Sequence, residues 1–163
     1  MSAALFDLGG RIALVTGSSR GIGFTLARGL ARAGARVVLN GRDPAALDTA
    51  TTALVTDGHD AVSVAFDVTD AAAVDAAIDG IEAGIGAIDI CVINAGIQRR
   101  APLHELDNAA WREVLDGNLS SAFYVGRAVA RKMIPRGRGK LVTTCSLMSE
   151  VGRPGTGDRK SVV

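Results

Sequence analysis

The chain has 163 residues and a net charge of +1 at pH 7, with 48% hydrophobic residues and 20 glycines. This length suits one domain with a substantial core, and the weak net charge excludes the broad basic field that attracts nucleic acid. No apolar run reaches the roughly 18 residues that a membrane span requires, and residues 1–7 lack the basic start and apolar centre of a signal peptide. We therefore expect a cytoplasmic protein without membrane, nucleic-acid or metal partners, whose Cys91 and Cys145 remain free thiols.

Short apolar runs alternate with amphipathic segments along the chain. Strands are predicted at 11–16, 36–40, 61–67, 88–94 and 140–144. Helices are predicted at 21–33, at 44–57, from residue 71 onward, around 111–115 and at 119–133, the last one ending before Pro135. Asp43 and Asp70 are expected to cap the second and third helices, and Pro44 is expected at the first helical position.

Strands that are joined by helical crossovers form parallel sheets with both faces covered. Because such crossovers are right-handed, we expect an α/β fold with a doubly wound, Rossmann-like parallel sheet of strand order 3-2-1-4-5 in three layers. The sheet is expected to be incomplete beside the fifth strand, which becomes an open edge. A ligand should bind at the carboxyl ends of the first, second and fourth strands, where the strand order reverses.

A glycine-rich turn connects the first predicted strand to the first predicted helix, and residues 16–23 read Thr-Gly-Ser-Ser-Arg-Gly-Ile-Gly. Gly17 permits a sharp turn, Gly21 lets the backbone approach a phosphate, and Gly23 lets the helix pack closely on the sheet. The helix N-terminus offers unpaired N–H groups and a partial positive charge to an anion, and Arg20 adds a full charge. This strand–turn–helix arrangement predicts a site for the diphosphate of a dinucleotide.

The turn has the pattern T-G-x-x-x-G-x-G, which resembles the cofactor motif of the short-chain dehydrogenase/reductase family. The resemblance continues in the same order through Asp67-Val68, Asn94-Ala95-Gly96, Asn118 and Cys145-Ser146. It implies an NAD(P)-dependent oxidoreductase that transfers hydride between the cofactor and a secondary alcohol or ketone. It also implies that Asp67 and Val68 contact the adenine.

The end of the second strand indicates which nicotinamide cofactor is preferred. In dinucleotide-binding folds an acid at this place accepts hydrogen bonds from the ribose and favours NAD(H). Here Gly41 stands in place of the acid, and Arg42 and Arg20 can bind a 2′-phosphate, so we expect NADP(H) to be preferred. The alternative is that Arg42 is a solvated turn residue beside the Asp43 cap. The expected cofactor-binding residues are Gly17, Ser19, Arg20, Gly21, Ile22, Gly23, Arg42, Asp67, Val68, Asn94, Ala95 and Gly96.

The family's catalytic group comprises a serine, a tyrosine, a lysine and an asparagine. The resemblance assigns the serine to Ser146, with Ser149 as a nearby alternative, and the asparagine to Asn118. Counted from Ser146, the family spacing places the tyrosine at Arg159 and the lysine at Val163, so both are absent. Arg159 cannot replace the tyrosine as acid and base, because a guanidinium stays protonated.

The only tyrosine of the chain, Tyr124, has no lysine four residues later and is expected to be a packing residue. From residue 158 onward the chain no longer resembles the family. We therefore expect residues 1–157 to be the N-terminal part of a dinucleotide-binding domain and residues 158–163 to be an aberrant tail, as in a truncated or frameshifted product. A chain without the tyrosine and the lysine is expected to be inactive.

Within the family, segments 5–8 and 94–100 look most like gluconate 5-dehydrogenases, which implies a sugar-acid substrate such as gluconate or 5-ketogluconate. Gln98, Arg99 and Arg100 can meet an anionic substrate, or they form a solvated loop. The alternatives are a 3-oxoacyl carrier-protein reductase and a non-catalytic NADP-binding module. The resemblance also implies that the full-length form is a homodimer or homotetramer.

Overall fold

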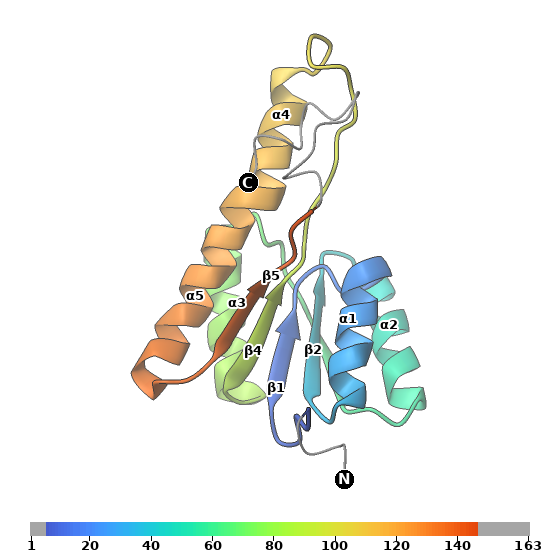
Figure 1. Ribbon diagram of the computed structural model, residues 1–163, viewed down its shortest axis with the longest axis vertical. Helices are drawn as coiled ribbons and strands as arrows, with labels where there is room; N and C mark the ends of the chain where they lie inside the picture. Colours follow the sequence, from blue (N-terminus) through green and yellow to red (C-terminus); the bar gives the residue numbers. More distant parts are fainter. Residues whose placement is uncertain (1–5, 147–163) are drawn as a thin grey trace.

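The structure, a computed structural model, describes residues 6–146. Strands and helices alternate from β1 (Ile12–Val15) to β5 (Lys140–Thr143) (Figure 1). Four features of the sequence analysis lie outside the described residues: the expected domain boundary at residue 157, the tail 158–163, the alternative Ser149, and the positions of Arg159 and Val163.

The strands form one parallel sheet in the order β3-β2-β1-β4-β5, which confirms the predicted topology. The remaining strands are β2 (Arg36–Gly41), β3 (Ala61–Ala65) and β4 (Ile88–Ile93). The register sets Val15 beside Leu39 and Val92, so the carboxyl ends of the three central strands meet along one edge. Among the strands, the largest boundary error is at β3, which ends at Ala65 and not at residue 67.

The helices cover both faces of the sheet (Figure 1). Helices α1 (Gly21–Arg32) and α2 (Pro44–Thr56) pack on one face, and helices α3 (Ala71–Gly84) and α5 (Ser121–Arg136) pack on the other. Neighbouring residues of a strand enter different cores, because side chains alternate across the sheet: Leu14 packs towards α3 and α5, whereas Val15 packs towards α1 and α2. Burial on both faces explains why the strands read as continuous apolar runs.

Carboxylates cap three of the helices. Asp43 accepts hydrogen bonds from the amides of Ala45 and Ala46, and Pro44 occupies the first position of α2, as predicted. Asp70 caps α3 in the same way, with N···O distances of 2.9 and 3.0 Å. Asp107 caps α4 (Asn108–Leu115) through the amide of Ala110 at 2.8 Å, a cap that the sequence analysis did not identify.

The predicted helix 119–133 is wrong at both ends. It is part of a continuous helical segment in which α4 passes through a π-helical turn, η2 (Asp116–Ser120), directly into α5. At the other end, α5 passes through Pro135 and ends at Arg136, where Gly137 takes a left-handed conformation with φ 64°. Pro135 removes one helical hydrogen bond in the last turn of α5, and the helix ends one residue later.

Strand β5 is the outer strand beside β4. Its apolar residues Leu141 and Val142 are 45% and 51% exposed, although they point to opposite faces of the sheet. Helix α5 therefore leaves this strand largely uncovered. The exposed edge that was predicted beside the fifth strand is confirmed within residues 6–146.

Candidate functional site

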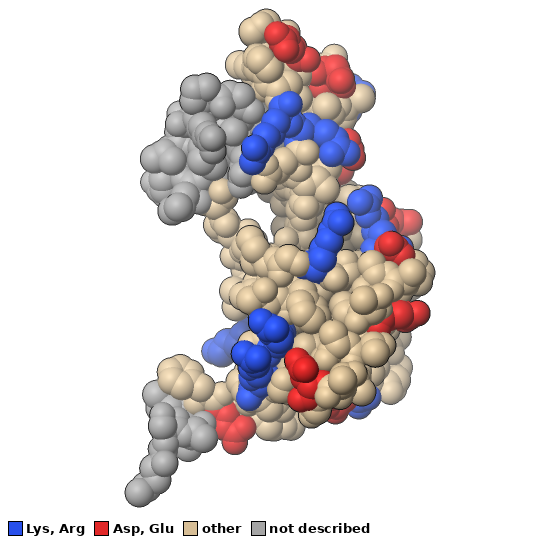
Figure 2. All heavy atoms as spheres, turned by 90° about the vertical axis from the view of Figure 1, so that its right-hand side faces the viewer, with Lys and Arg blue, Asp and Glu red and all other residues tan. Residues whose placement is uncertain are grey.

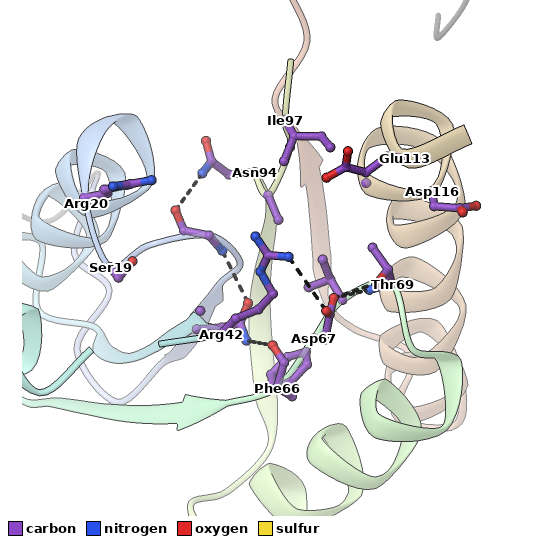
Figure 3. Close-up of a pocket in the computed structure, with 17 residues that line it drawn as sticks. Ser19, Arg20, Arg42, Phe66, Asp67, Thr69, Asn94, Ile97, Glu113 and Asp116 are labelled. Atoms are coloured by element: carbon purple, nitrogen blue, oxygen red, sulfur yellow. Dashed lines mark hydrogen bonds and ion pairs between the residues drawn. The ribbon is translucent and has the colours of Figure 1, made fainter. Parts of the chain in front are cut away.

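A pocket of about 380 Å³ lies at the carboxyl ends of β1, β2, β3 and β4 (Figure 3). This is the edge of the sheet where the sequence predicted a ligand. Nine of the predicted cofactor-binding residues line it: Gly17, Ser19, Arg20, Arg42, Asp67, Val68, Asn94, Ala95 and Gly96. The lining also contains residues that the sequence analysis did not select, namely Asn40, Gly41, Phe66, Thr69, Ile97, Glu113, Asp116 and Gly117.

The glycines of the turn are required by close contacts. Gly17 has φ 62°, and a Cβ there would lie 2.8 Å from the Cα of Ala95. A Cβ on Gly23, at the start of α1, would lie 2.3 Å from the carbonyl oxygen of Gly17. Gly21 also has a positive φ of 60°, but open space surrounds it. The turn is thus held against both α1 and the segment that follows β4, as the roles predicted for Gly17 and Gly23 require.

Thr16 and Asn94 connect the turn to β4. The hydroxyl oxygen of Thr16 accepts hydrogen bonds from the amides of Asn94 and Ala95 at 2.9 and 3.1 Å. The side-chain amide of Asn94 donates to the carbonyl oxygens of Thr16 and Gly17 at 3.1 and 3.2 Å. Asn94 therefore fixes the backbone of the turn, a role more specific than the ligand contact that was predicted for it.

Asn40, at the end of β2, is a structural residue that the sequence analysis missed. It is 1% exposed, and its Oδ1 accepts from the amide of Gly17 at 3.3 Å. Its Nδ2 donates to the carbonyl oxygens of Phe66 and Val64 at 3.1 and 3.4 Å. The amide of Asn40 donates to the hydroxyl of Ser18, which is also fully buried. The sequence does contain a signal for this role. An amide side chain that directly follows an apolar strand is expected to be buried and to need hydrogen-bond partners.

The start of α1 brings a positive charge to the pocket, because Arg20 lies there. Arg20 is the N-cap of α1, with extended backbone and no side-chain capping bond, so its side chain does not occupy the first amides of the helix. Gly21, Ile22 and Gly23 follow in the first turn of α1 and do not line the pocket. Ile22 is 68% exposed.

Arg42 extends over the pocket towards Asp67 (Figure 3). Its Nη1 lies 4.0 Å from Oδ2 of Asp67, and Oδ1 of Asp67 accepts from the amide and the hydroxyl of Thr69 at 2.9 and 2.8 Å. Burial by itself would raise the pKa of Asp67, but the bonds from Thr69 and the charge of Arg42 outweigh it and lower the pKa. Asp67 is therefore an anion at neutral pH, and Arg42 lies beside it at the pocket although its side chain is 69% exposed.

The predicted catalytic asparagine, Asn118, lies in the π-helical turn behind the pocket. Its Oδ1 accepts from the amide of Ile97 at 2.7 Å, and its Nδ2 donates to the carbonyl oxygen of Ile97 at 3.0 Å. A Cβ on Gly96 would approach Oδ1 of Asn118 to 3.0 Å. Asn118 thus anchors the segment after β4 to the helix, and π-helical turns are frequent at functional sites.

Ser146, the predicted catalytic serine, follows β5 by three residues and is partly buried. The amide of Thr144 still bonds to the carbonyl oxygen of Ile93, so the chain leaves the sheet close to β4. Neither Ser146 nor Asn118 is among the residues that line the pocket. Tyr124 packs edge-to-face on Phe123 with ring centroids 5.9 Å apart, beneath the guanidinium of Arg127, which confirms a packing role.

The loop after β4 carries the predicted anion-binding side chains. Arg99 pairs with Glu113 of α4, with Nε 2.8 Å from Oε2, and Nε of Arg100 donates to Oε1 of Gln98 at 3.1 Å. All four of these side chains are exposed. The loop is therefore solvated at its surface. Its Arg99 is paired with Glu113, which lines the pocket.

On the face that Figure 2 shows, basic and acidic side chains are interspersed, and they form no continuous patch of one sign. The charged residues that line the pocket are likewise of both signs, with Arg20 and Arg42 on the one hand and Asp67, Glu113 and Asp116 on the other. No helix within residues 6–146 combines the length and the apolarity that crossing a bilayer requires.

Residues 11–157 match the family model described as short chain dehydrogenase. The chain belongs to this family. It is 55% identical over 151 residues to gluconate 5-dehydrogenase of Gluconobacter oxydans (strain 621H), in an alignment that covers 93% of this chain and 59% of that enzyme. It is 43% identical over 149 residues to 5-keto-D-gluconate 5-reductase of Escherichia coli (strain K12), again covering 59% of the relative. The predicted family and its predicted likeness to gluconate 5-dehydrogenases are both confirmed.

A solved structure of a gluconate 5-dehydrogenase from Burkholderia cenocepacia J2315, in complex with NADP and tartrate, has a TM-score of 0.95 and 48% identity to this short-chain dehydrogenase. The match covers 99% of this chain and 64% of that one. The chain spans 59% of the length of the Gluconobacter enzyme and 59% of the length of the Escherichia coli enzyme. The likeness holds over nearly the whole of this chain and over part of each longer relative.

The pocket of this short-chain dehydrogenase fits a dinucleotide on its own geometry. The backbone of the turn lines the pocket at Gly17 and Ser19, and Gly17 carries no side chain there. Arg20 and Arg42 add positive charge to the lining, and Asp67 and Val68 line the same pocket. The arrangement can bind an elongated ligand that carries phosphate near its middle.

Proposed function

We propose that this chain is the dinucleotide-binding part of an NADP(H)-dependent oxidoreductase that acts on a sugar acid of the gluconate or 5-ketogluconate type. The observation that carries the cofactor preference is the replacement of an acid by Gly41 at the end of β2, with Arg42 directly after it at the pocket. The NADP complex of the Burkholderia relative supports the same cofactor. When bound, NADP(H) supplies or accepts the hydride.

The pocket residues would hold the cofactor in three places. The backbone of Gly17, Ser19, Gly21, Ile22 and Gly23, with Arg20, would bind the diphosphate. Arg42 would bind the 2′-phosphate through charge-assisted hydrogen bonds. Asp67 and Val68 would contact the adenine, and the segment Asn94, Ala95 and Gly96 would line the path towards the nicotinamide.

We propose Ser146 and Asn118 as the catalytic serine and asparagine of the family. Asn118 has one N–H and one oxygen lone pair left after its two bonds to Ile97, which is enough for a contact with a water molecule. The 163-residue sequence has no tyrosine or lysine at the family's spacing after Ser146. We therefore expect this chain to bind the cofactor without oxidising an alcohol.

The substrate proposal rests on the likeness to the Gluconobacter enzyme and on the loop after β4. Arg99 already forms a two-point ion pair with the carboxylate of Glu113, which is the geometry that an arginine uses to bind a carboxylate substrate. We further propose a homodimer or homotetramer for the full-length form. The two free thiols support a cytoplasmic location.

Fluorescence titration of the 163-residue chain with NADPH and with NADH tests the cofactor proposal. We expect NADPH to bind about tenfold more tightly, and we expect Arg42→Ala to remove most of this difference, since a charged hydrogen bond contributes about 1.5–3 kcal/mol. Equal losses for both nucleotides in Arg42→Ala, or no binding of either, would contradict the proposal. Oxidation of gluconate with NADP⁺ by the unaltered chain would contradict the expected lack of catalysis.

A further inference from the structure

One carboxylate at the pocket faces the arginine that we propose as the 2′-phosphate ligand. Oδ2 of Asp67 lies 4.0 Å from Nη1 of Arg42 (Figure 3). The other carboxylate oxygen, Oδ1, is held by the amide and the hydroxyl of Thr69 at 2.9 and 2.8 Å. Because Thr69 uses only Oδ1, it directs Oδ2 towards the guanidinium.

The pair neutralises charge without fixing the guanidinium. A separation of 4.0 Å is too long for a hydrogen bond, and the side chains of Arg42 and Asp67 are 69% and 39% exposed. An exposed pair of this kind restrains a flexible arginine only weakly. Asp67 nevertheless attracts the guanidinium of Arg42 in the free protein, so an anion that binds Arg42 must compete with this carboxylate.

We propose that Asp67 competes with the 2′-phosphate of the cofactor for Arg42, and that it thereby limits how strongly the site prefers NADPH over NADH. This inference rests on the proposed function, in which Arg42 binds the 2′-phosphate. NADH has no such phosphate and leaves the Asp67–Arg42 pair intact. NADPH must share the guanidinium with a carboxylate that is held in place, so part of the attraction is lost. Asp67 is then a specificity-determining residue that acts through Arg42.

The ratio of the dissociation constants for NADH and NADPH measures this effect directly. Any contact that Asp67 makes with the adenine is common to both nucleotides and cancels in the ratio. Asp67→Asn is the appropriate variant, because the amide oxygen can still accept from Thr69 while the charge is removed. We expect this variant to raise the ratio about two- to fivefold, the range that an exposed ion pair supports.

The double variant Asp67→Asn with Arg42→Ala identifies the route of the effect. If Asp67 acts through Arg42, the additional Asp67→Asn change leaves the ratio of the Arg42→Ala protein unchanged. An equal rise of the ratio in both backgrounds would overturn the inference, since it would show direct repulsion of the phosphate by Asp67. An unchanged or lowered ratio in the single Asp67→Asn variant would also overturn it.

These outcomes differ from a failure of the proposed function. If Arg42 does not bind the 2′-phosphate, Arg42→Ala alone leaves the ratio unchanged, whatever Asp67→Asn does. If Arg42 does bind it, Arg42→Ala lowers the ratio, and only the response to Asp67→Asn decides the inference. Binding is measured by nucleotide fluorescence on the 163-residue chain, so the result does not depend on turnover.

Discussion

Replacing Gly23 by alanine tests whether the backbone of the glycine turn is the centre of the site. Gly23 lies in the first turn of α1 and is buried. A Cβ there would lie 2.3 Å from the carbonyl oxygen of Gly17 and 2.5 Å from Nδ2 of Asn94. Ordinary contacts of a Cβ begin at 3.4 Å, so the turn must move by about 1 Å. The same atoms carry the hydrogen bond that joins the turn to Asn94.

The expected cost combines overpacking with lost hydrogen bonds. Overpacking in a close-packed region costs about 1–3 kcal/mol, and each of the two bonds that Asn94 donates to the turn contributes about 0.5–1.5 kcal/mol. The helix propensity of alanine returns about 0.5–1 kcal/mol. We therefore expect the free energy of unfolding of Gly23→Ala to fall by about 3 kcal/mol and the affinity for NADPH to fall at least about tenfold.

Gly29 provides the matched control in the same helix. It is exposed, and nothing lies within 4 Å of a Cβ built on it. Gly29→Ala should raise the free energy of unfolding by about 0.5–1 kcal/mol and leave NADPH binding unchanged. Urea unfolding and fluorescence titration of the two variants measure both quantities. Wild-type NADPH affinity in Gly23→Ala would refute the reasoning, because it would show that the turn can move by 1 Å without affecting the ligand.

Three further predictions concern residues beside the turn and in the core. Asn40→Leu leaves the amide of Gly17 and the carbonyl of Phe66 without their partner, so we expect the free energy of unfolding to fall by about 3 kcal/mol and titration to show equal losses of NADPH and NADH. Asn118→Ala frees the amide of Ile97, and hydrogen exchange followed by mass spectrometry should show faster exchange there, with α3 unchanged. Burial raises the pKa of the Cys91 thiol to about 12, while Cys145 is exposed, so a thiol reagent at pH 8 should modify one cysteine in the folded chain and both in denaturant.

The fold was predictable because its signals are local and agree with one another. The apolar run 37–39, bounded by Arg36 and Asn40, favours a strand buried on both faces. Asp43 with Pro44 predicts the start of the following helix. The turn 16–23 is predictable for the same reason, since three glycines between a strand and a helix have few other uses. Nine pocket residues therefore follow from sequence motifs.

What could not be predicted depends on contacts between distant segments. An amide at the end of an apolar strand indicates that Asn40 needs buried partners, but those partners in β3 and in the turn are more than 20 positions away, and no local pattern identifies them. The π-helical turn around Asn118 likewise has no signature in the apolar periodicity, because it arises where the helix meets Ile97. The sequence analysis ended this helix before Pro135, because proline usually breaks a helix. In the structure the helix continues through Pro135 and ends where Gly137 takes a left-handed conformation.

The residues that local patterns did not explain share one physical origin. Where parallel strands end, the last backbone groups lose their ladder partners, and buried groups of this kind must be paired in another way. Thr16 and Asn94 do this between β1 and β4, and Asn40 does it between the turn, β2 and β3. The polar frame of the pocket is therefore complete before a ligand arrives. If Arg20 and Arg42 bind the cofactor as proposed, the ordering cost of binding falls mainly on these two exposed side chains. A weak contact such as that between Arg42 and Asp67 is then expected to alter the cofactor preference.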